Sequence, residues 1–103
     1  MKPVVIHSAA RAELDDAMAF YESRARGLGL DLQAKVEEAV ARIQHNPEAW
    51  PPHKRSGFRK YFTERFSFTV FYMDRPDCIW VAAVAHGSRR PDYWRRRRRE
   101  QEA

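Results

Sequence analysis

The spacing of apolar residues changes once along this chain, near Gly57, and this change constrains the fold more than any other feature of the sequence. Between residues 8 and 45, apolar side chains recur at steps of three and four, which is the spacing of amphipathic helices. From Gly57 onward the period becomes two, which is the spacing of β-strands. A chain of 103 residues has room for one hydrophobic core. The sequence therefore predicts a single domain, residues 1–103, with a helical half followed by a sheet half.

Two helices are expected in the first half. Ser8 is expected to be the N-cap of the first helix, which runs to about Arg26, because its hydroxyl can accept an amide proton of the first turn. The second helix is expected from about Leu28 to His45 and ends at Asn46-Pro47, since proline disfavours helical geometry in the residue before it. Gly27-Leu28-Gly29 supplies a short turn between them, so the two helices form a helical hairpin.

Four strands are expected around this hairpin. Residues 58–63, 66–72 and 79–85 predict a three-stranded antiparallel meander. The last of these segments is apolar on both faces, which favours a central position. Val4–Ile6 is a short β-branched run that would complete a four-stranded sheet, and Pro91-Asp92 would open a short C-terminal helix. The expected fold is α+β, with both helices packed on one face of the sheet.

The charge of the chain is unevenly distributed. The net charge is +5, but residues 1–52 carry −2 and residues 53–103 carry +7. The run Arg95–Arg99 supplies five of the basic residues, and residues 95–103 are expected to form an exposed basic tail. The asymmetry indicates that the sheet half faces a polyanion or an acidic partner; the alternative is a solvated tail with no partner.

Several classes of protein are excluded or disfavoured. The single cysteine, Cys78, cannot form an internal disulfide or a cysteine-based zinc site, and the four histidines show no metal-binding spacing, so we expect neither a metal nor another cofactor. No apolar run is long enough for a transmembrane helix, and no signal-peptide pattern begins the chain. These features predict a cytoplasmic protein without a membrane partner.

The segment from His86 to Trp94 reads His-Gly-Ser-Arg-Arg-Pro-Asp-Tyr-Trp. It resembles the C-terminal signature of the RelE/ParE superfamily of bacterial type II toxin–antitoxin toxins, in which the last strand exits through His-Gly-x-Arg-Arg or a relative and then reaches Pro-x-x-Trp or Tyr. Gly27-Leu28-Gly29, Asn46-Pro47-Glu48 and residues 65–72 match other parts of that pattern, so the resemblance spans Val4 to Trp94. It implies a small growth-inhibiting toxin that a cognate antitoxin neutralises. Dimers and heterotetramers with the antitoxin are both compatible with it.

The resemblance leaves the target open between two activities. ParE-like toxins poison DNA gyrase, whereas RelE-like toxins cut mRNA on the ribosome. The His-Gly-x-Arg-Arg-Pro form resembles the ParE-like and uncharacterised branches more closely, and the lysine pair and the histidine–tyrosine ending of the nuclease branches are not reproduced. We therefore expect a ParE-like toxin that acts by binding. The alternatives are a RelE-like, metal-independent mRNA endonuclease and a non-toxic accessory domain that binds nucleic acid.

The candidate functional residues are mostly cations. RNA cleavage would need a base, an acid and cations on the phosphate. His86 and Tyr93 could move protons, and Arg89 and Arg90 would complete that catalytic set if the protein is a nuclease. The residues expected to bind the target or nucleic acid are Arg59, Lys60, Arg65, Arg89 and Arg90. The structural alternatives are that His86 is satisfied at a strand end, that Arg59 and Arg65 form a polar sheet face, and that Tyr93 and Trp94 anchor the C-terminal helix.

Overall fold

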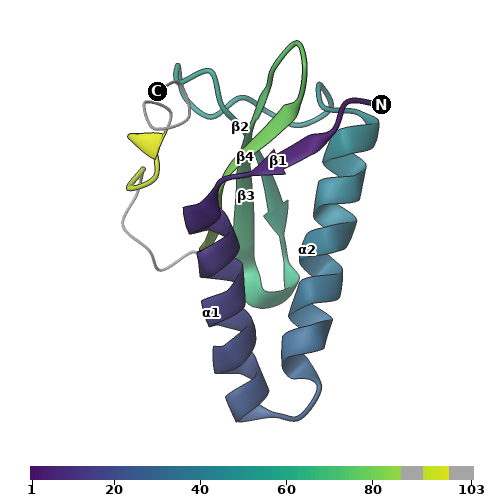
Figure 1. Ribbon diagram of the computed structural model, residues 1–103, viewed down its shortest axis with the longest axis vertical. Coiled ribbons are helices and arrows are strands. Elements are labelled where there is room, and N and C mark those ends of the chain that lie inside the picture. The colour runs from purple at the N-terminus through teal and green to yellow at the C-terminus, as the bar shows by residue number, and fades with distance from the viewer. Residues whose placement is uncertain (87–91, 98–103) are drawn as a thin grey trace.

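The computed structural model of the protein describes residues 1–86 and 92–97 (Figure 1). A short strand is followed by two long helices and then by three strands, the order that the periodicity predicts. The elements are β1 (Val4–Ile6), α1 (Ser8–Arg24), α2 (Leu28–His45), β2 (Arg59–Thr63), the short 3-10 turn η1 (Arg65–Ser67), β3 (Phe68–Asp74) and β4 (Ile79–His86). No helix within the described ranges is long and apolar enough to cross a membrane.

The four strands form one sheet in the order β1-β4-β3-β2. The meander β2-β3-β4 is antiparallel, as expected, whereas β1 runs parallel to β4, with Val4 opposite Ile79 and Ile6 opposite Val81. The sheet is therefore mixed. β4 lies between two strands and is buried along almost its whole length, which confirms the central position predicted from its apolar faces.

Helices α1 and α2 lie side by side across one face of the sheet (Figure 1). Their apolar stripes pack against β3 and β4 in the main core, as the hairpin predicts. Tyr72 is fully buried there, and its hydroxyl donates a 2.7 Å hydrogen bond to the carbonyl of Pro47. Burial raises the pKa of Tyr72 to about 12. The main core consists of Ala10, Leu14, Leu32, Val36, Ala39, Ile43, Phe68, Val70, Tyr72, Ile79, Val81 and Val84.

The start of α1 differs from the expectation. Ser8 is the first helical residue, and the N-cap is His7, whose Nδ1 atom accepts the amide proton of Ala9 at 3.0 Å. The prediction of Ser8 as N-cap was wrong because an imidazole nitrogen supplied the acceptor that the hydroxyl was expected to supply. The helix ends at Arg24, two residues earlier than expected.

The hairpin turn depends on its two glycines in different ways. Gly27 has φ +86°, a conformation that L side chains rarely adopt. A Cβ atom on Gly29 would lie 2.6 Å from the carbonyl oxygen of Met18, so α1 and α2 approach each other across this residue. The Glu22 carboxylate accepts the amide protons of Gly27 and Gly29 at 2.9 and 3.0 Å, which fixes the turn.

The sheet has a second, smaller core on the face away from the helices, and a β-bulge in β4 adds to it. Phe71 lies opposite Ala83 while Tyr72 lies opposite Val81, so Ala82 is the extra residue. Ala82 and Ala83 consequently both belong to the outer cluster, which also contains Phe58, Cys78, Trp80 and Trp94. Trp94 is 1% exposed and stacks on Phe71 with ring centroids 4.3 Å apart. Trp94 therefore anchors the C-terminal segment on the sheet, the structural role considered for it above.

The C-terminal helix was expected in a region that is only partly described. Residues 92–97 form successive turns, closed by backbone hydrogen bonds from Arg95 to Asp92 at 3.1 Å and from Arg97 to Trp94 at 3.0 Å. We call residues 92–97 the C-terminal turn. Within the expected exposed tail, Arg95 and Arg96 are exposed, whereas the Arg97 side chain is mostly buried.

Candidate functional site

The cations expected on β2 lie on opposite faces of the sheet, because successive strand residues point in opposite directions. Arg59 pairs in register with the buried Tyr72, on the helix face, and its Nη1 donates to the carbonyl of Trp50 at 2.8 Å. Lys60 pairs with Phe71 and therefore lies on the outer face, where it is exposed. The structure thus separates Arg59 from Lys60 and ties Arg59 to the loop before β2.

Arg65 lies at the corner between β2 and β3. Its Nη2 is 3.3 Å from the Asp31 carboxylate on α2, and its guanidinium carbon lies 4.8 Å from the ring centroid of Phe66. Phe66 and Ser67 have φ of 69° and 53°, so the corner extends through them and β3 begins at Phe68, not at Phe66 as expected. Arg65 therefore contacts the start of α2 and does not join Lys60 in one site.

Of the expected nuclease set, His86 and Tyr93 are described, whereas Arg89 and Arg90 lie outside the described residues. His86 is the last residue of β4, and its ring packs edge-on against Phe68 with centroids 5.2 Å apart. Tyr93 donates its hydroxyl proton to the carboxylate of Glu13 on α1. The hydroxyl of Tyr93 therefore binds a carboxylate of α1.

Glu13 is the centre of a mostly buried polar cluster. Its Oε1 atom lies 3.0 Å from Nη1 of Arg97, and the two side chains are 10% and 12% exposed.

Strand β1 ends at Ile6, opposite Val81, so the edge of β4 beyond Val81 has no neighbouring strand in the sheet. Glu13 accepts the Val84 amide proton at 3.2 Å, and Arg97 donates to the Ala82 carbonyl at 2.8 Å. Side chains thus satisfy backbone groups at this edge of the sheet, where a strand would otherwise pair.

A second polar cluster holds the other end of the C-terminal turn. Nε2 of His53 lies 2.7 Å from the Asp92 carboxylate, which also accepts a hydrogen bond from Lys54. These bonds, first from Lys54 and then from His53, lower the pKa of Asp92 below its ordinary value. The ring of His53 packs against Phe71 and Trp94. The loop before β2 and the C-terminal turn are therefore joined across the outer core.

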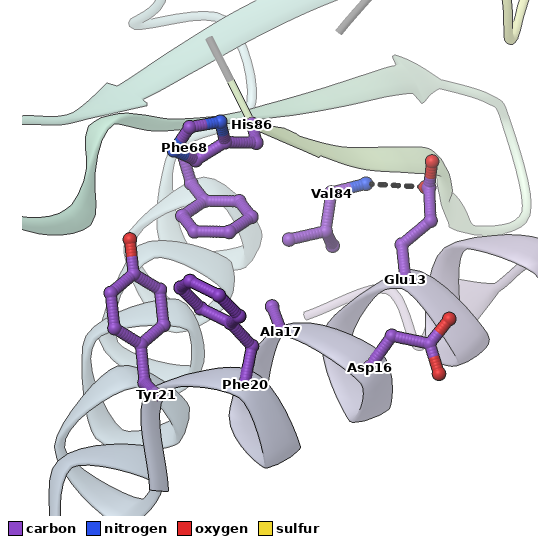
Figure 2. Close-up of a pocket in the computed structure, with 8 residues that line it drawn as sticks. All are labelled: Glu13, Asp16, Ala17, Phe20, Tyr21, Phe68, Val84 and His86. Carbon is purple, nitrogen blue, oxygen red and sulfur yellow. Dashed lines mark hydrogen bonds between the residues drawn. The ribbon is translucent and has the colours of Figure 1, made fainter. Parts of the chain in front are cut away.

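A groove of about 460 Å³ lies between α1 and the end of β4 (Figure 2). The rings of Phe20, Tyr21 and Phe68 gather at one end, below His86, and the carboxylates of Glu13 and Asp16 lie at the other (Figure 2). Phe20 is 50% exposed. The groove is completed by Ala17 and Val84.

The sequence did not single out this groove or the two polar clusters. Glu13, Asp16, Ala17 and Phe20 share one face of α1 at steps of three and four, which was a readable signal for the helix wall of the groove. Glu13 also shares that face with the buried Ala10, so a buried carboxylate in need of a cation could have been inferred. His53 and Asp92, by contrast, are 39 positions apart, and no local pattern relates them.

Residues 4–91 match a family model described as the ParE toxin of the type II toxin–antitoxin system parDE. This match covers most of the chain, from β1 to the segment after β4. No curated protein matches the chain.

Proposed function

The chain belongs to the ParE toxin family of type II toxin–antitoxin systems, and from this premise we propose that it arrests bacterial growth by binding DNA gyrase. A cognate antitoxin neutralises it. The His-Gly-x-Arg-Arg-Pro form at the end of the last strand supports the ParE-like target, because it resembles the ParE-like branch more closely than the RelE-like nucleases.

The observation that carries a binding mechanism is the position of the Tyr93 hydroxyl. A tyrosine that protonates a leaving oxygen must present its hydroxyl to the substrate within hydrogen-bond distance. Here the hydroxyl donates to Glu13, whose carboxylate also binds Arg97 in a mostly buried ion pair. Tyr93, one of the two described candidates for proton transfer, is thus engaged in holding the C-terminal turn on the domain, which favours binding over RNA cleavage.

The outer face of the sheet offers the basic surface for such binding. Lys60 lies opposite Phe71, whose ring stacks on Trp94, so Lys60 and the C-terminal turn share this face. Arg95 and Arg96 are exposed on the same turn. We call Lys60, Arg95 and Arg96 the outer basic surface and propose that it contacts the target.

The test is induction of the toxin in growing bacteria that carry a reporter plasmid. We expect growth to stop and the plasmid to lose negative supercoils while mRNA stays intact. Co-expression of the antitoxin encoded beside the toxin should restore growth. Cleaved mRNA with normally supercoiled plasmid would contradict gyrase as the target, and unimpaired growth with abundant folded protein would contradict toxicity.

A further inference from the structure

The groove between α1 and the end of β4 is acidic at one end, although the chain carries a net charge of +5 (Figure 2). The two carboxylates of the groove differ in their partners. Glu13 is neutralised by Arg97 and binds Tyr93. Asp16 is exposed and makes no hydrogen bond or ion pair within the described part of the chain. The groove therefore presents one uncompensated negative charge.

Next to this charge lies an apolar surface that the domain itself leaves half covered. Phe20 follows Asp16 by one helical turn and is 50% exposed. Its ring packs edge-on against Tyr21, and the Arg24 guanidinium lies 4.9 Å from its centroid, so neighbours hold it in place. Phe68 and Val84 continue the apolar wall on the sheet side (Figure 2). Aromatic residues are enriched in protein interfaces, where they serve as anchors for partner side chains.

Resting on the proposed function as an antitoxin-neutralised toxin, we propose that this groove receives a segment of the antitoxin with a defined chemistry. A lysine or arginine of that segment pairs with Asp16, and a neighbouring apolar side chain packs on Phe20 and Phe68. The carboxylate of Asp16 selects a cation by charge complementarity, and the groove of about 460 Å³ has room for one or a few side chains.

The negative charge of Asp16 helps to determine which part of the antitoxin docks in the groove. Long-range attraction from a basic toxin draws an acidic partner without fixing where along the partner it docks. The acidic site on α1 repels the acidic residues of the same partner and attracts its basic ones. Asp16 is therefore a specificity-determining residue that sets which segment of the antitoxin enters the groove.

The experiment compares the affinity of purified toxin variants for the purified antitoxin by calorimetry at low and high salt. Asp16→Lys and Phe20→Ala are each expected to weaken binding at least about tenfold. The matched control is Asp15→Lys, which makes the same charge change at the neighbouring exposed position outside the groove and is expected to stay within about twofold of wild type. The Asp16→Lys effect should shrink at high salt because it is electrostatic.

Other affinity results overturn the proposal. The proposal is contradicted if the antitoxin affinity of Asp16→Lys or of Phe20→Ala stays within about twofold of wild type. It is also contradicted if Asp15→Lys weakens the affinity as much as Asp16→Lys does, because net charge alone would then explain the effect. A second assay tests the proposed function separately: it measures the supercoiling activity of gyrase with each toxin variant in the absence of antitoxin. Unchanged antitoxin affinity with lost gyrase inhibition would assign the groove to the target. Absent gyrase inhibition by wild type would contradict the target and leave the antitoxin affinities as the test of the groove.

Discussion

Glu13 on α1 and Arg97 in the C-terminal turn form an ion pair of 3.0 Å across 84 positions of sequence, with both side chains nearly buried. The pair ties the C-terminal turn to the first helix around the free edge of β4. At the other end of the turn, Asp92 is held by His53 and Lys54. The turn that carries Arg95 and Arg96 is thus fastened at both ends.

Replacing Glu13 should be costly, because Arg97 would keep its charge in a nearly buried position. We expect Glu13→Ala to lower the free energy of unfolding by about 2–4 kcal/mol, measured by urea denaturation. Glu13→Gln, which can still accept the Val84 amide proton, should lose less. The exposed Asp15→Ala should stay within about 0.5 kcal/mol of wild type. A loss from Glu13→Ala no larger than that from Asp15→Ala would show that the pair does not fasten the turn.

The hydrogen bonds to Asp92 predict a pH dependence with a definite sign. Its pKa is lower in the folded protein than the ordinary value of 3.8, so its contribution to stability is fully present above that value and is lost as the pH falls through the folded pKa. Asp92→Asn keeps the shape and tolerates the φ of 58°, yet should lower stability at neutral pH by about 1–2 kcal/mol. As the pH falls from 3.8 through the folded pKa of Asp92, the two unfolding curves should converge. A difference that stays constant through acid pH would contradict the assignment.

The two hairpin glycines should respond differently to alanine. Gly29→Ala places a Cβ 2.6 Å from the Met18 carbonyl oxygen, and separating the helices should cost about 2 kcal/mol or more. Gly27→Ala meets no atom within 4 Å but must adopt a positive φ, which should cost about 1 kcal/mol. Thermal unfolding of the two variants gives the order. If the two variants lost equal stability, the close approach of the helices at Gly29 would not be the main cost of adding a Cβ atom there.

The outer basic surface should matter for the target and not for the fold. Reversing the charges of Lys60, Arg95 and Arg96 together is expected to weaken gyrase inhibition at least about tenfold, because exposed cations contribute to association while adding little to stability. Arg11→Glu, a charge reversal on the exposed surface of α1, is the single-site control. Inhibition unaffected by the triple reversal would place the contact elsewhere on the domain.

Much of the fold followed from local pattern. The α2 bounds and the central place of β4 could be predicted because helix spacing and a strand apolar on both faces report local burial directly. The parallel pairing of β1 could not, since three β-branched residues carry no information on strand direction. His7 replaced Ser8 as the N-cap because the choice of cap depends on which side chain reaches the first amides.

The site was harder to predict because it depends on which distant residues meet. Arg59 and Lys60 are adjacent cations in sequence, yet strand geometry sends them to opposite faces. The Glu13, Tyr93 and Arg97 cluster joins segments about 80 positions apart, which spacing within one element cannot reveal. Glu13, a negative residue on a half-buried face of α1, was the one feature of local sequence that pointed to that cluster.

The most direct test of the central claim is a titration of purified gyrase with purified toxin, following the supercoiling of relaxed plasmid. We predict that supercoiling falls as toxin is added and recovers when the antitoxin is added in equimolar amount. Full supercoiling in the presence of a large excess of folded toxin would contradict the claim that this protein acts by binding gyrase.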